Sequence, residues 1–280
     1  MSIKSLQLDF TVRKYRELCL AITSSNYTPL TFREYLLPAH AGQKIVILRH
    51  DVDRKPLNAL AIAKLENELG IKATYYFRAY DDMFVPSIIE KIKSFGHEIG
   101  YHYEVLSKAN GDHVKAIKMF DSDLKKFRQD FEVNTISMHG SPLSKYNNLD
   151  IWNLYDYRNY GIIGEAYLSA GPGISYISDT GRSWSQKWKY RDIVPNNGPD
   201  MGVRTTDDLI RLIDQDTVPG LYLLTHPERW SFTIPGWTTN YLNDLMMNIG
   251  KKMIMRLRKN RGYRLPDINS NKTAKQDEIR

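Results

Sequence analysis

The chain has 280 residues, of which 42% are apolar and 25% charged. This is the composition of a folded protein with a sizeable core, and it excludes collagen, coiled coils and wholesale disorder. No apolar run approaches the ~20 residues that span a bilayer, and the N-terminal sequence lacks the pattern of a signal peptide. Together with the single cysteine, Cys19, which fits a reducing compartment, this predicts a cytoplasmic protein.

The net charge of +7 is unevenly distributed along the chain. Residues 251–280 hold 10 basic and 3 acidic residues, which leaves 29 of each sign in residues 1–250. A neutral body argues against a basic groove for nucleic acid, so no nucleic-acid partner is expected. The excess indicates a basic tail or a basic helix end.

The predicted elements alternate in type after a helical start. Apolar residues at helical spacing from residue 10 onward, a break at 26–29 and a short helix at 31–37 form an N-terminal extension, residues 1–40. Strands are then predicted at 44–49, 71–78, 97–102, 133–139, 161–168, 174–179 and 221–226, and helices at 56–70, 84–95, 112–130 and 205–215. Such alternation is typical of a parallel sheet with crossover helices, either a barrel or a doubly wound sheet. The predicted domain covers residues 41–262, followed by a polar basic tail, 263–280.

Polar residues fall at the ends of several predicted strands. The carboxyl ends of parallel strands meet on one rim, where such folds place their chemistry. The residues concerned are Asp51, Asp53, His102, His139, Asp179 and His226.

Asp51 and Asp53 face the same way if the backbone is extended, since side chains repeat every two residues. Two carboxylates on one side of a strand end suit a division of roles, one holding a metal and the other accepting a proton. A helix cap at Asp53 is the structural alternative. His226 follows an apolar strand, and its ordinary pKa near 6.5 suits a general acid.

The remaining candidates have both functional and structural interpretations. Glu104 shares the side of His102 in an extended backbone, and His139 ends a strand in a turn. Asp179, Arg182 and Trp184 provide a carboxylate, a cation and an indole for orienting a catalytic group or gripping a sugar. A purely structural pair between Asp179 and Arg182 would give the same pattern.

Three segments resemble motifs of the polysaccharide deacetylase (NodB-homology) family, the metal-dependent carbohydrate esterases of family 4. They are Asp51-Val52-Asp53, the segment Gly96–His102 and Leu224-Thr225-His226-Pro227. The resemblance implies a distorted seven-stranded (β/α) barrel. It also implies that Asp51 is the base, that Asp53 and His102 bind the metal, and that His226 is the acid.

The sequence departs from the family pattern at two places. Leu106 stands where the family usually has a second ligand histidine, so His139, with Glu104 as runner-up, is predicted to be the third ligand. A His139-Gly140-Ser141-Pro142 turn replaces the family's usual arginine motif. Mixed nitrogen and oxygen ligands suit one divalent ion, with zinc expected first and iron, cobalt or nickel as alternatives.

These features predict a metal-dependent hydrolase that removes an acetyl group from an N-acetylated sugar. The expected substrate is a nucleotide- or lipid-linked precursor of a surface polysaccharide. A barrel that only binds carbohydrate is the alternative.

Residues 241–261 form a predicted helix whose apolar stripe is expected to cover the barrel. A second hypothesis is that residues 251–280 contact an anionic membrane surface. Nothing in the sequence indicates an oligomeric state.

Overall fold

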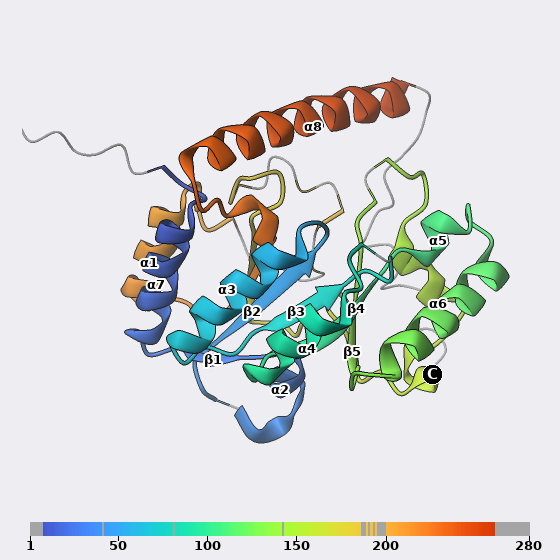
Figure 1. Ribbon diagram of the computed structural model, residues 1–280, viewed down its shortest axis with the longest axis horizontal. Helices are drawn as coiled ribbons and strands as arrows, with labels where there is room; N and C mark the ends of the chain where they lie inside the picture. Colours follow the sequence, from blue (N-terminus) through green and yellow to red (C-terminus); the bar gives the residue numbers. More distant parts are fainter. Residues whose placement is uncertain are drawn as a thin grey trace, which may run out of the picture.

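The computed structural model describes residues 8–40, 42–80, 82–141, 143–185, 189, 191–192, 194 and 200–260, without the side chains of 255 and 257–260. The predicted tail 263–280 lies outside the described residues. One sheet of eight parallel strands forms the centre of the molecule (Figure 1). The strands are β1 (Thr28–Leu30), β2 (Ile45–Val52), β3 (Thr74–Phe77), β4 (Glu98–Tyr103), β5 (Thr135–Met138), β6 (Gly164–Glu165), β7 (Ser175–Ser178) and β8 (Gly220–Thr225).

The strand order is β6-β5-β4-β3-β2-β8-β7, with β1 pairing beside the first half of β2. Every strand pair is parallel. Within the described residues β6 pairs only with β5 and β7 only with β8, so the curled sheet stays open between β6 and β7. The α/β fold with a distorted (β/α)7-type barrel is therefore confirmed.

The helices lie around the sheet and begin where the sequence favours it. Pro56 opens α3, Asp112 caps α6, and Thr205 forms a capping box at α7. The helices are α1 (Val12–Thr23), α2 (Phe32–Leu36), α3 (Pro56–Glu68), α4 (Pro86–Ser94), α5 (Val105–Lys108), α6 (His113–Arg128), α7 (Thr206–Gln215) and α8 (Ile234–Asn260). Short 3-10 helices lie at η1 (Pro38–His40), η2 (Asn148–Asn153), η3 (Tyr157–Tyr160) and η5 (Pro227–Arg229).

The N-terminal residues are packed into the body of the fold. Tyr15, Leu18 and Ile22 of α1 are fully buried in the main core. The segment predicted as a break at 26–29 contributes instead to β1, which extends the sheet along β2. The predicted domain boundaries at residues 40 and 262 remain predictions.

Strands β2 and β8 are buried along their whole length, as their nearly continuous apolar sequences indicate. Three polar residues, Arg49, His50 and Asp51, interrupt β2, and Arg49 and His50 point to opposite faces because of the two-residue repeat. Arg49 lies inside the barrel over the ring of Tyr167, at 4.3 Å from its centroid. His50 lies on the other face, where its Nε2 is 2.8 Å from Glu66 Oε1 of α3.

The C-terminal helix α8 differs from its prediction. It was expected to cover the barrel with its apolar stripe, but Leu242, Met246 and Met253 are 51%, 71% and 60% exposed. Asp244 and Asn248, on the opposite face, are buried. The expectation was wrong because the surface beneath α8 consists of polar loops, so the helix is docked through polar side chains. In the described part of the chain, no helix has both the length and the apolar character that crossing a membrane requires.

Candidate metal centre and catalytic site

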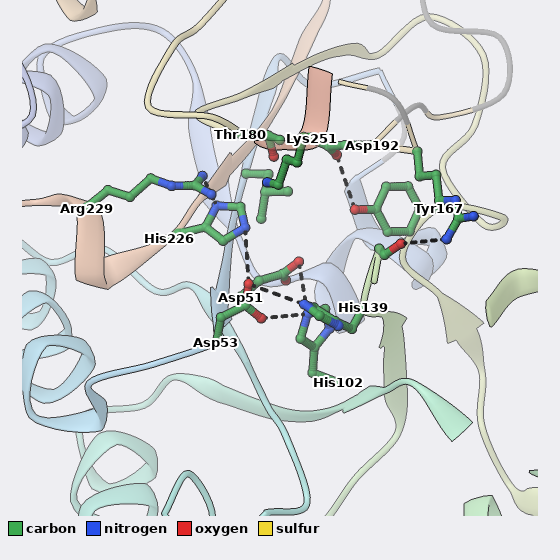
Figure 2. Close-up of a pocket in the computed structure, with 13 residues that line it drawn as sticks. Asp51, Asp53, His102, His139, Tyr167, Thr180, Asp192, His226, Arg229 and Lys251 are labelled. Carbon is green, nitrogen blue, oxygen red and sulfur yellow. Dashed lines mark hydrogen bonds and ion pairs between the residues drawn. The ribbon is translucent and has the colours of Figure 1, made fainter. Parts of the chain in front are cut away.

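Three side chains from neighbouring strand ends converge on one point. Asp53 follows β2, His102 belongs to β4, and His139 follows β5. One ligand atom from each lies within 4.8 Å of the others. His102 Nε2 is 3.3 Å from Asp53 Oδ1, and His139 Nε2 is 3.6 Å from Asp53 Oδ2 (Figure 2).

The second nitrogen of each histidine has its own partner outside this cluster. His102 Nδ1 is 3.0 Å from the carbonyl oxygen of Ser137, and His139 Nδ1 is 2.8 Å from Glu104 Oε2. With Nδ1–H donating to these oxygens, both Nε2 atoms present a lone pair to the shared point. Such outer hydrogen bonds are typical of histidines that bind metals, because they fix the tautomer and the ring orientation. Glu104 therefore lies behind His139, outside the three-residue cluster.

The carboxylate of Asp53 fits a cation. Asp53 Oδ1 is buried and accepts no hydrogen bond of good geometry within the described structure. Burial favours the neutral acid, but His139 and His102 outweigh it and hold the pKa of Asp53 well below its ordinary value. Burial likewise opposes the charge on His139, yet Asp53 and Glu104 raise its pKa to about 9. A carboxylate facing two imidazole nitrogens is a suitable donor set for a divalent transition metal.

Asp51 lies beside this cluster, with Oδ2 3.6 Å from His102 Nε2. It is 2% exposed and is held by Arg49, whose Nε and Nη2 donate to its two carboxylate oxygens at 2.8 and 2.7 Å. Arg49 also donates to the hydroxyl of Ser137. Because the Arg49 guanidinium donates to both oxygens, the Asp51 carboxylate is held in one orientation, toward the cluster.

His226 also lies beside the cluster, with Nε2 3.9 Å from Asp53 Oδ2. Its Nδ1 is 2.6 Å from Asp179 Oδ1, and its backbone N–H donates to Asp179 Oδ2 at 2.9 Å. Arg229 Nη1 donates to the same Oδ1 at 2.7 Å. Burial and Arg229 lower the pKa of His226, but Asp179 and Asp53 outweigh them and raise it. The imidazole is thus oriented by Asp179, with Nε2 directed at the site.

A cavity of about 90 Å³ lies over these residues, and helix α8 reaches it. Lys251 of α8 is half-buried there, opposite His102 and His139 (Figure 2). A neighbouring cavity of about 340 Å³ shares Asp53, His139, Arg229 and Lys251 with the first. The remaining residues that line the smaller cavity are Asp51, His102, Gly140, Tyr167, Thr180, Arg191, Asp192, Leu224 and His226.

Two candidates for substrate contact lie elsewhere. Trp184 is 2% exposed and packs with Phe10 and Trp230 in the core, so it cannot touch a substrate. Arg182 Nη1 donates to the carbonyl of Arg229 at 2.8 Å and lies 3.7 Å from Asp244, so it joins η5 to α8. Neither side chain lines the two cavities described above, because the turn after β7 directs both away from them.

Sequence reasoning missed Arg49, Arg229 and Lys251. The first two had a local signal: Arg49 is two residues before Asp51, on the same face of its strand, and Arg229 is three residues after His226. Lys251 had none, since only the docking of a distant helix brings it to the cavity.

No protein-family model matches the chain, and no curated protein gives a significant match. Solved structures similar to it include a CE4 esterase of Streptococcus mutans, at 17% identity and a TM-score of 0.42, covering 86% of this chain and 91% of that one. A family 4 carbohydrate esterase from Bacillus anthracis matches at 13% identity and a TM-score of 0.38, covering 90% and 87%. A CE4 family pseudoenzyme from the same organism matches at 15% and 0.41, covering 80% and 64%. Because these sequence identities and TM-scores are low, the function must be inferred from the geometry of the site.

Proposed function

We propose that this protein is a metal-dependent hydrolase that removes the acetyl group from an N-acetylated sugar. One observation carries the proposal. Asp53, His102 and His139 form a donor set for a metal, with an oriented carboxylate, Asp51, and an oriented imidazole, His226, beside it. Amide hydrolysis needs an activated carbonyl, an activated water and a proton for the leaving amine, and this arrangement has a group for each.

Each residue has a distinct role in the proposed reaction. A divalent ion bound by Asp53, His102 and His139 would supply Lewis-acid polarisation of the acetyl carbonyl. Asp51, held by Arg49, accepts a proton from the attacking water. His226 then donates the proton at Nε2 to the sugar nitrogen as the C–N bond breaks. The products are acetate and the free amino sugar.

Zinc is the first expectation for the metal, because two imidazoles and one carboxylate, with positions left open, form a frequent catalytic zinc site. Iron, cobalt and nickel accept the same mixture of nitrogen and oxygen ligands. This mixture disfavours magnesium and calcium, which take oxygen ligands.

The cations around the cavity favour a substrate that carries negative charge. Arg229 Nε is buried without a hydrogen-bond partner in the described structure, and Lys251 is half-buried at the same cavity. A phosphate-linked N-acetyl sugar, attached to a nucleotide or a lipid, would bring such a charge close to its acetyl group. We therefore propose a precursor of a surface polysaccharide as the substrate and the cytoplasm as the place of reaction.

The test combines metal analysis with acetate release. Protein purified without chelators should contain about one divalent ion per chain and release acetate from at least one member of a panel of neutral and phosphate-linked N-acetyl sugars. Asp53→Ala with His102→Ala should lose the metal. Asp51→Asn and His226→Gln should keep it and lose ~100-fold or more in rate.

Three outcomes would contradict the proposal. Full metal content in the Asp53→Ala, His102→Ala double variant would remove the metal site. An unimpaired His226→Gln variant would remove the acid. Saturable sugar binding by the metal-loaded protein without any acetate release would favour a non-hydrolytic carbohydrate-binding barrel.

A further inference from the structure

Helix α8 is amphipathic, but it turns its polar face to the protein and its apolar face to solvent, the reverse of a helix that covers a core. Five apolar residues at spacings of three and four lie on one stripe of the helix, and all of them are at least 41% exposed. They are Leu242, Leu245, Met246, Ile249 and Met253. Tyr241, Ile234 and the preceding Phe232 are 45%, 71% and 52% exposed. Apolar surface of this extent on one element is unusual for a free surface and marks an interaction site.

The opposite face of α8 holds the helix on the protein through polar contacts. Asn240 Nδ2 donates to the carbonyl of Glu228 at 3.0 Å, and Asn248 Nδ2 donates to the carbonyl of Gly181 at 2.8 Å. Asp244 lies 3.9 Å from Arg54 and is also near Arg182. These residues recur every four positions, as one helix face does. Helix α8 lies along one side of the molecule (Figure 1). Its polar face is turned to the protein, which leaves the apolar stripe exposed.

Positive charge accompanies the apolar stripe. Lys252 and Arg256 are exposed on the outer side of α8. Between residues 234 and 250 the single acidic residue is Asp244, which is turned inward and buried. The sequence from 251 to 280 adds an excess of basic residues, 10 against 3 acidic. The outer face of the described helix is thus apolar and cationic, without a carboxylate.

We propose that α8 binds an anionic membrane surface, lying in the plane of the interface with its apolar stripe among the lipid acyl chains. An apolar face flanked by Lys and Arg is the composition of interfacial helices, and both parts contribute to their binding. A second copy of the chain would present the same carboxylate-free, cationic surface, so it offers no complementary charge. The proposal concerns a surface rather than the reaction, and it does not depend on the proposed function.

Sedimentation of the full-length protein with vesicles tests this directly. We expect strong binding to phosphatidylcholine vesicles that contain phosphatidylglycerol and weak binding to phosphatidylcholine alone, with the difference lost at high salt. Met246→Ser with Met253→Ser should weaken binding to the anionic vesicles at least tenfold. Lys252→Ser with Arg256→Ser should weaken it roughly fivefold per residue.

The controls are exposed residues elsewhere on the protein. Leu57 and Val114 are 67% and 58% exposed, and their replacement by Ser should leave binding unchanged. Unchanged thermal unfolding of all variants shows that folding is intact, since the substituted side chains face solvent. Equal binding to both vesicle types, or negligible binding to both, would overturn the proposal. So would a stable dimer in solution that Met246→Ser with Met253→Ser converts to a monomer.

Discussion

Arg49 holds the carboxylate of Asp51 from within the same strand, with Nε and Nη2 at 2.8 and 2.7 Å from the two oxygens. Both side chains are almost completely buried inside the barrel. The pair is possible because residues two apart on a strand share a face. The guanidinium also lies over the ring of Tyr167, which fixes its plane and hence that of Asp51.

Replacing Arg49 by Lys should reduce the catalytic rate by about 100-fold while the metal is retained. The ammonium keeps the charge but cannot donate to both carboxylate oxygens, so Asp51 loses its single orientation. Turnover and metal content, measured on the same preparation, check this. Arg33→Lys is the control, because Arg33 is an exposed arginine paired with Glu132. A variant as active as the wild type would show that the paired hydrogen bonds from Arg49 do not position Asp51.

Much of the site followed from one rule about parallel sheets, that the carboxyl ends of the strands meet on one rim. Asp51, Asp53, His102, His139 and His226 all line the same cavity. Their individual roles stay proposals. The rule works because it depends only on where strands end, which the alternation of apolar and turn residues indicates.

Predictions failed where orientation depends on tertiary contacts. The stripe on α8 showed an amphipathic helix but not which face meets the protein. Trp184 follows a strand end like the site residues, yet its indole N–H donates to Thr206 and its ring packs on Phe10 in the core. In both cases the local pattern is correct, and the neighbouring surface decides the outcome.

Replacing Asp179 by Asn should move the alkaline limb of the pH–rate profile to lower pH. The Asp179 carboxylate stabilises the protonated imidazole of His226 and is one reason that the pKa of His226 is raised. Without its charge, the acid loses its proton at a lower pH. The profile of kcat/KM between pH 5 and 10 measures the shift. A limb that moves upward, or does not move, would exclude His226 as the acid that Asp179 orients.

Replacing Glu104 by Gln should weaken metal binding by roughly 10- to 100-fold without abolishing it. Glu104 accepts from His139 Nδ1 at 2.8 Å, so it directs Nε2 of that ring toward the metal. Competition with a chelator measures the affinity, and Glu132→Gln, at an exposed carboxylate, is the control. Complete loss of the metal would instead make Glu104 a ligand.

Replacing Lys251 by Met should raise KM for phosphate-linked N-acetyl sugars about tenfold and leave kcat nearly unchanged. The ammonium lines the cavity but takes no part in the proton transfers proposed for Asp51 and His226, so it should contribute equally to the ground and transition states. Lys252→Met is the matched control, because Lys252 is the next residue along the helix and its side chain is exposed to solvent. An equal loss with neutral sugars would show that Lys251 does not recognise the charged group.

Replacing Glu66 by Gln should remove part of the acid sensitivity of folding. The buried carboxylate of Glu66 is 2.8 Å from His50 Nε2 and accepts from the hydroxyl of Tyr75 at 2.6 Å. Burial opposes its charge, but His50, His97 and Tyr15 outweigh burial and lower the pKa to about 2.

The sign of the effect follows from comparing the two states. An unfolded Glu has a pKa near 4.3, so folding favours the ionised form by about 3 kcal/mol. This contribution is complete above about pH 5 and is lost as the pH falls through 2, below which both states are protonated. Urea unfolding between pH 7 and 3 should give a free energy that falls less steeply for Glu66→Gln than for the wild type. Glu68→Gln, at a carboxylate that is 51% exposed on the same helix, should follow the wild-type slope. Parallel curves for the wild type and Glu66→Gln would show that Glu66 is not held ionised in the folded protein.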